Sequence, residues 1–114
     1  MQIPLRRVGK TSLKLPVLGL GTVPLANLWD WKKDAVVKGT FQGAWDNGVK
    51  YIDKAPLYGH TLAEHRVGEF LRDQDSDEYL ISTTVGRLYS RFQGRAKDFD
   101  GGHFGELWFR GRPM

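Results

Sequence analysis

Residues 50–59 have the sequence KYIDKAPLYG, which carries the clearest indication of the fold. Its first four residues are rich in β-formers and predict a short strand ending at Asp53, and Tyr58 lies in the loop that follows. Loops after the carboxyl ends of parallel strands build the active sites of α/β barrels, so Asp53 and Tyr58 are candidates for one site. Spacing alone also fits a structural alternative, in which Asp53 caps the loop and Tyr58 covers the sheet edge.

Upstream of this stretch, a helix is predicted from its N-cap, Asp34, to the residue before Gly48, which stops it. Its apolar stripe at helical spacing is formed by Val37, Phe41, Ala44 and Trp45. The continuous apolar run at residues 17–21 predicts a strand buried on both faces. Two alternating runs, residues 5–8 and 13–15, flank a turn-forming cluster and predict a hairpin.

Downstream, Thr61 and Glu64 have capping-box spacing, in which two side chains satisfy each other's backbone amides at a helix start. The apolar face of that helix is expected to consist of Val67, Phe70 and Leu71. A third strand is predicted at residues 78–83. The order strand, helix, strand, helix, strand predicts a right-handed parallel sheet of the α/β class.

The regular pattern ends near residue 88. Beyond it, glycines interrupt a basic and aromatic stretch that has no sustained period. Residues 1–88 are therefore predicted to form the folded part, and residues 89–114 an irregular or disordered tail.

Composition restricts the chemistry. The 114 residues contain no cysteine, which excludes disulfides and thiolate catalysis, and 40% of them are apolar, as in a globular domain. The net charge of +4 comes from basic residues interleaved with acidic ones, which is typical of a solvated surface, so we expect no nucleic-acid partner. No apolar run approaches the ~20 residues of a membrane span, and the start does not resemble a signal peptide. We expect a cytoplasmic chain with no membrane partner.

Two other kinds of site are not expected. The histidines, His60, His65 and His103, stand apart from one another with no carboxylates at ligand spacing, so no metal site is predicted. The glycine pair of Gly19 and Gly21 lacks the third glycine of the Rossmann fingerprint, so no Rossmann-type dinucleotide site is predicted.

Three segments carry a resemblance to a known family. They are Gly19-Leu20-Gly21-Thr22, Asp53-Lys54-Ala55-Pro56-Leu57-Tyr58-Gly59 and Ser82-Thr83-Thr84-Val85-Gly86-Arg87. In order and spacing they resemble successive motifs of the aldo-keto reductases over about residues 5–88, and they are most similar to the aldose and L-fucose dehydrogenase branch. The resemblance implies a partial (β/α)8 TIM barrel, with an N-terminal hairpin and about three β/α units, truncated after the N-terminal third.

The resemblance also implies an activity and a site. In this family a hydride passes between a nicotinamide cofactor, NADP or NAD, and the carbonyl or alcohol carbon of a sugar or another small carbonyl compound. A tyrosine transfers the proton, and Tyr58 matches it. Asp53 matches the aspartate that orients a neighbouring lysine. Gly21, Thr22 and Asp53 match positions near the nicotinamide end of the cofactor.

The sequence departs from the family at the lysine. A free tyrosine has a pKa near ~10, and the family's lysine ammonium favours the phenolate form. Thr84 stands at the lysine's position. Lys54 replaces the threonine that usually follows the aspartate, but successive strand residues point to opposite faces, so Lys54 is expected to face the helix layer.

Other parts of the family's machinery, a histidine after the fourth strand and the phosphate-binding residues, belong to later strands than this sequence contains. We therefore expect an oxidoreductase by family that neither binds the cofactor tightly nor turns over alone. Two alternatives are an assembly module that completes a barrel with other chains, self-associating through open sheet edges, and an active aldose 1-dehydrogenase in which Tyr58 acts unaided. Trp29 and Trp31 fit either a substrate mouth or packing anchors.

Overall fold

The computed structural model describes residues 2–27, 30–85, 108–109 and 112–113. It divides into two compact units, residues 1–84 and 85–114. In the second unit, β6 (Trp108–Phe109) and β7 (Arg112–Pro113) pair in antiparallel fashion. The rest of the tail predicted to be irregular, residues 89–114, lies outside the described residues, and that prediction stays open to test.

The first unit begins with a hairpin of β1 (Leu5–Arg7) and β2 (Lys14–Pro16), paired antiparallel with Arg6 opposite Leu15. The amide of Val8 donates to the carbonyl of Leu13 at 2.9 Å and closes the turn. The predicted hairpin is therefore confirmed.

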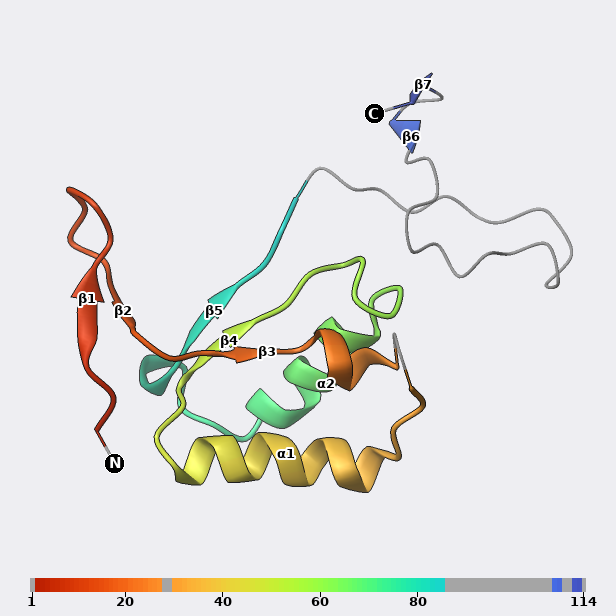
Figure 1. Cartoon of the computed structure of the whole chain (residues 1–114), viewed down its shortest axis with the longest axis horizontal. Coiled ribbons are helices and arrows are strands. Elements are labelled where there is room, and N and C mark those ends of the chain that lie inside the picture. The colour runs from red at the N-terminus through yellow and green to blue at the C-terminus, as the bar shows by residue number, and fades with distance from the viewer. Residues whose placement is uncertain (1, 28–29, 86–107, 110–111, 114) are drawn as a thin grey trace, which may run out of the picture. The chain divides into compact units, whose positions relative to one another are not determined.

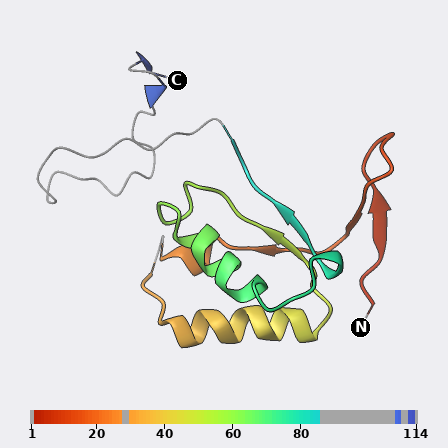
Figure 2. The ribbon, with the colours of Figure 1, turned by 180° about the vertical axis from the view of Figure 1, so that it is seen from behind.

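A three-stranded parallel sheet follows, with β4 (Tyr51–Asp53) between β3 (Leu20–Gly21) and β5 (Leu80–Ser82). The connections carry α1 (Asp34–Asp46) and α2 (Leu62–Leu71), and both helices lie on one side of the sheet (Figure 1). Figure 2 shows the same arrangement from behind. The predicted alternation of strands and helices is confirmed. No helix in the described ranges is long and apolar enough to cross a membrane.

The core lies between the sheet and the two helices. Its buried members come from the central strand, both helices and η1 (Val23–Ala26), a short 3-10 helix after β3; they are Leu25, Val37, Phe41, Ile52, Val67 and Leu71. The ring of Phe41 stacks on that of Phe70, with centroids 5.1 Å apart. Both apolar stripes predicted from helical spacing therefore face the core.

The first parallel strand differs from its prediction. Only Leu20 and Gly21 pair as β3, and the side chain of Val17 is 53% exposed, so a strand from residue 17 buried on both faces is wrong. The amide of Val17 instead donates to the carbonyl of Pro4 at 2.9 Å, because the chain at this point still runs beside the hairpin. In the described residues helices cover one face of the sheet, and an apolar run by itself cannot tell one buried face from two.

Both predicted helix caps are replaced by longer-range contacts. Lys33 holds the N-cap position of α1, and Asp34 is instead the first helical residue, with its carboxylate 2.7 Å from the Arg66 guanidinium. Thr61 is the N-cap of α2, but its φ is +76° and its side chain makes no cap bond. In this left-handed conformation the hydroxyl does not reach the amides of the first turn, and Glu64 pairs with Lys54. The capping-box prediction is wrong, although the helix begins where predicted.

Candidate functional site

Asp53 lies in a row of three residues at the carboxyl ends of the parallel strands. It is the last residue of β4, with Gly21 of β3 as its register partner on one side and Ser82 of β5 on the other. Its neighbour Ile52 is buried against the helices, so by strand alternation Asp53 faces the side of the sheet away from them. This face of the carboxyl edge is the candidate site.

Hydroxyl groups donate hydrogen bonds to both the carboxylate and the backbone carbonyl of Asp53. The Ser82 hydroxyl donates to the Asp53 carboxylate, and the Tyr51 hydroxyl donates to Ser82 Oγ at 3.0 Å. The Thr22 hydroxyl and amide donate to the Asp53 backbone carbonyl at 2.8 and 3.2 Å. A neutral hydroxyl thus orients the Asp53 carboxylate, because Ser82 lies opposite Asp53 in the sheet and donates to it.

Gly21 and Thr22 play different parts beside Asp53. The Thr22 side chain is completely buried, at 0% exposure, with its hydroxyl committed to the Asp53 carbonyl. Gly21 is exposed, and a Cβ added to it would meet no atom within 4 Å. Thr22 therefore holds the end of β4 through the Asp53 backbone carbonyl, while Gly21 leaves open space next to the Asp53 carboxylate.

Tyr58 lies in the connection between β4 and α2 and is half-buried. Its amide donates to the carbonyl of Ala55 at 3.1 Å, and its carbonyl accepts from the amide of Ala63 in the first turn of α2. The next residue, Gly59, has a φ of +63°, and a Cβ there would come within 2.8 Å of the Ala26 Cβ. The Tyr58 loop is therefore fastened to α2 and packed directly on η1.

Lys54 points away from the candidate site. Its ammonium is 2.7 Å from a carboxylate oxygen of Glu64 on α2, and its side chain is only 17% exposed. The Thr83 hydroxyl donates to the same Glu64 oxygen at 3.0 Å. The prediction that Lys54 faces the helix layer is confirmed, and this pairing argues against Lys54 as a substitute for a lysine on the Asp53 side.

Comparison with known proteins identifies the family. A family model described as the aldo/keto reductase family matches residues 17–101. The chain belongs to the aldo/keto reductase family. It is 41% identical over 83 residues to pyridoxal 4-dehydrogenase of Microbacterium luteolum. The aligned residues make up 73% of this chain and 24% of the relative. It is also 41% identical over 77 residues to D-threo-aldose 1-dehydrogenase of a Pseudomonas species, covering 68% of this chain and 23% of the relative.

Solved structures of aldo-keto reductases share the fold. One from Bacillus halodurans, in a holo form, matches with a TM-score of 0.67 at 24% identity. The match covers 83% of this chain and 29% of the Bacillus halodurans chain. One from Pseudomonas aeruginosa has a TM-score of 0.58 at 35% identity and covers 72% of this chain and 31% of its own. The predicted α/β class, as part of an aldo-keto reductase TIM barrel, is confirmed. The chain spans about a quarter of the length of the curated relatives it matches.

Sequence reasoning missed two residues that contribute to the candidate site, Ser82 and Tyr51. In the sequence Ser82 stands out only as part of a family motif, and Tyr51 only as a β-former. Strand alternation is the signal that could have found Tyr51, because Tyr51 and Asp53 are two residues apart and share a face. The register that places Ser82 opposite Asp53 comes from the sheet and from nothing local in the sequence.

The Lys54–Glu64 pair gives an expected pH dependence. The hydrogen bond from Lys54 lowers the pKa of Glu64 below its ordinary value, against a smaller opposing effect of burial. A carboxyl group whose pKa is lower in the folded state stabilises the fold above its unfolded pKa, and loses that contribution as the pH falls through the folded value. We expect Glu64→Gln to be about 1 kcal/mol less stable than wild type at neutral pH, with the difference fading below about pH 4.

Urea denaturation at several pH values measures this difference. Glu69→Gln is the matched control, because Glu69 is on the same helix and its pair with Lys38 is exposed and longer, at 3.9 Å. The control should lie close to wild type throughout. A Glu64→Gln deficit that stays constant from neutral to acidic pH would contradict the assignment.

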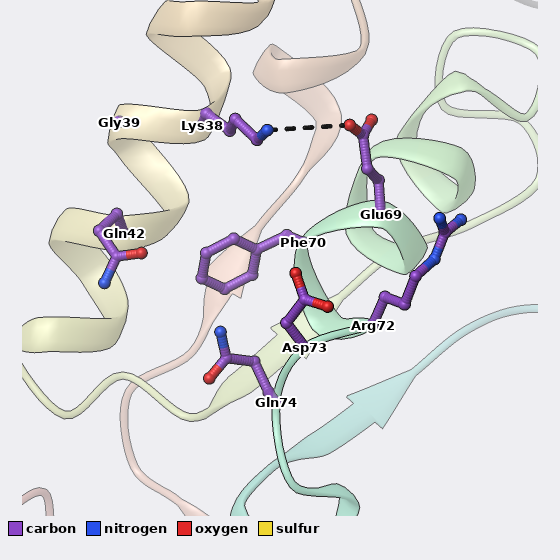
Figure 3. A pocket seen from close by; sticks show the side chains of 8 residues that line it. All are labelled: Lys38, Gly39, Gln42, Glu69, Phe70, Arg72, Asp73 and Gln74. Atoms are coloured by element: carbon purple, nitrogen blue, oxygen red, sulfur yellow. Dashed lines mark ion pairs between the residues drawn. The ribbon is translucent and has the colours of Figure 1, made fainter.

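A separate groove lies between α1 and α2, on the helix side of the sheet (Figure 3). Phe70 projects between the helices in it, and the Lys38–Glu69 ion pair crosses it. Within the described part of the chain no group of His, Asp and Glu residues is suited to hold a metal ion. The groove lies on the opposite side of the sheet from the Asp53 face, so we do not count it as part of the candidate site.

Proposed function

We propose that this chain contributes the first part of the active site of an NAD(P)-dependent oxidoreductase acting on a sugar or aldehyde. The observation that carries the proposal is the row of Gly21, Asp53 and Ser82 at the carboxyl edge of a parallel sheet, where barrel active sites form. The family and the names of the relatives, an aldose dehydrogenase and a pyridoxal dehydrogenase among them, support the substrate class.

The residues present fit the nicotinamide end of such a cofactor. Gly21 leaves open space beside the Asp53 carboxylate, into which a flat ring can approach the backbone. The cofactor, when bound, supplies or accepts the hydride. In the proposal the Tyr58 hydroxyl moves the proton to or from the substrate oxygen, and Asp53 orients the neighbouring polar groups. Thr22 acts by holding the Asp53 backbone.

The sequence position at which the family carries its lysine holds an uncharged side chain. Thr84 stands where the family pattern has a lysine, and Lys54, the lysine nearest to Tyr58 in the sequence, is paired with Glu64 on α2. A neutral hydroxyl at residue 84 does not supply the positive charge with which a lysine favours a phenolate. We therefore propose that this chain neither binds the cofactor tightly nor turns over alone.

A chimera tests the function. Residues 17–101 replace the matching segment of pyridoxal 4-dehydrogenase, with either Thr84 or Thr84→Lys. Sugar-dependent reduction of the oxidised cofactor, or aldehyde-dependent oxidation of NAD(P)H, is followed by absorbance. We expect Thr84→Lys to raise kcat by about 10²- to 10⁴-fold, the usual contribution of a positioned general acid or base. Adding Tyr58→Phe should remove that gain.

Two results would contradict the proposal. Equal activity with Tyr58 and with Tyr58→Phe would remove the tyrosine from the chemistry, and no response to Thr84→Lys would mean that residue 84 does not occupy the lysine's position. The isolated 114-residue chain is the control, and it should show no NAD(P)H binding tighter than roughly 100 μM in a fluorescence titration.

A second candidate is an assembly module that completes a barrel with other chains. The observation in its favour is that β5 is an outer strand of the described sheet and that Ile81 on it is 42% exposed. Outer strands present unpaired backbone groups to other strands. Self-association through these edges stays a prediction, and the elution volume of the purified control chain in size-exclusion chromatography reports on it directly.

A further inference from the structure

Arg66 joins two segments that are far apart in the sequence. It projects from the middle of α2, and its side chain is only 11% exposed. It donates three hydrogen bonds into the connection between β3 and α1, to the carbonyl of Leu25 (2.5 Å), the side-chain oxygen of Asn27 (3.1 Å) and the carbonyl of Lys32 (3.2 Å). A fourth goes to the carboxylate of Asp34, the first residue of α1, at 2.7 Å. One guanidinium thus ties both ends of that connection to α2.

The acceptors explain why an arginine is needed. Leu25 lies in the last turn of η1, and Asn27, which ends η1, has a left-handed φ of +58°, so the carbonyls there leave the helical pattern. A planar guanidinium presents several donors in a fixed fork and can serve acceptors on two sides at once, whereas an ammonium is a compact point charge. The Asn27 side chain also accepts from the amide of Lys32 at 2.9 Å, so the connection is closed on itself as well as on α2.

The segment that Arg66 holds also touches the candidate site at two places. Thr22, directly before η1, donates to the Asp53 carbonyl. Ala26, at the end of η1, packs so closely on Gly59 that a Cβ there would lie 2.8 Å from the Ala26 Cβ. Gly59 follows Tyr58 in the chain. A shift of η1 relative to α2 would therefore move the surface on which the Tyr58 loop rests.

We infer that Arg66 is a positioning residue, whose guanidinium fixes η1 against the Tyr58–Gly59 loop and so sets the place of the Tyr58 phenol relative to Asp53. The importance of this phenol position for catalysis rests on the proposed function. The position of the phenol itself can be measured in the chain without cofactor or substrate.

Fluorine NMR of the full chain, labelled with fluorotyrosine, tests the inference. The sequence has four tyrosines, and the Tyr58 signal is assigned by its disappearance in Tyr58→Phe. We expect Arg66→Met to shift the Tyr58 signal and to leave that of Tyr51 in place, because Tyr51 is held from β5 through Ser82. Arg66→Lys, which keeps the charge and loses the fork, should shift the Tyr58 signal as well.

Two controls separate positioning from stability. Arg72→Met removes an exposed arginine at the end of the same helix and should leave both signals unchanged. Val37→Ala lowers stability through the core of α1 and should not move the Tyr58 signal selectively. An unshifted Tyr58 signal in folded Arg66→Met or Arg66→Lys, or an equal shift in Val37→Ala, would overturn the inference. Arg66→Lys decides the matter if Arg66→Met does not fold.

The outcome is independent of the proposed function. If the Tyr58 signal moves while the chimera shows no Tyr58-dependent turnover, the proposed function fails and the role of Arg66 stands. If the chimera shows Tyr58-dependent turnover but the Tyr58 signal does not respond to substitution of Arg66, the role of Arg66 fails and the proposed function stands.

Discussion

Gly59→Ala is expected to destabilise the first unit by about 2–4 kcal/mol, from backbone strain and overpacking together. Gly59 has a φ of +63°, a conformation that costs a residue with a Cβ about 1–2 kcal/mol. The new methyl would also press on backbone and side-chain atoms of Ala26, which cannot swing aside as the end of a long side chain would. The measurement is urea denaturation followed by circular dichroism.

Gly43→Ala is the matched control for this change. Gly43 lies in α1, and a Cβ there would meet nothing within 4 Å. Alanine is the better helix former by about 1 kcal/mol, so this control should be slightly more stable than wild type. If Gly59→Ala were as stable as the control, the close approach of the Tyr58 loop to η1 would be wrong.

Phe41→Ala is expected to cost about 3–5 kcal/mol of unfolding free energy, the usual range for a buried aromatic residue. Its side chain is 2% exposed and lies in the core cluster that joins α1, α2 and the central strand. Its ring also stacks on Phe70, which adds roughly 0.5–1.5 kcal/mol beyond the area buried. In a unit of this size such a loss is comparable to the whole stability, so the expected result is a weak or absent thermal transition.

Val36→Ala on the same helix is the comparison for Phe41. The Val36 side chain is 53% exposed, so its truncation should change stability by less than about 0.5 kcal/mol. A Phe41→Ala variant that melted like Val36→Ala would show that α1 does not pack on the sheet as described.

Several elements were predictable because their signals are local. The hairpin at the start has two alternating runs around a turn, and both helices have apolar residues at 3.6-residue spacing, and each of these patterns forms where predicted. The end of α1 was also predictable, because Gly48 adopts the left-handed φ of +82° that a helix stop requires. Asp53 was found because it ends a strand of recognisable composition.

The errors share a different cause. Asp34 and Glu64 were assigned to local caps, but each carboxylate pairs with a cation from a distant segment, Arg66 and Lys54 respectively. A partly buried cation needs an anionic or carbonyl partner more than an exposed helix end needs a cap, which water can replace. The prediction of a strand buried on both faces from residue 17 was wrong for a similar reason, because burial depends on what covers a strand.

By itself, the sequence determined the α/β order, the core stripes, the family motifs and the threonine at residue 84, since each depends on residue type and short-range spacing. Three contacts follow from the folded chain alone: Ser82 bonds the Asp53 carboxylate, Lys54 pairs with Glu64, and Arg66 bonds the η1 carbonyl of Leu25. These contacts join residues ten to forty-one positions apart. The register of the sheet and the packing of helix on strand set them, and neither is encoded in any single stretch.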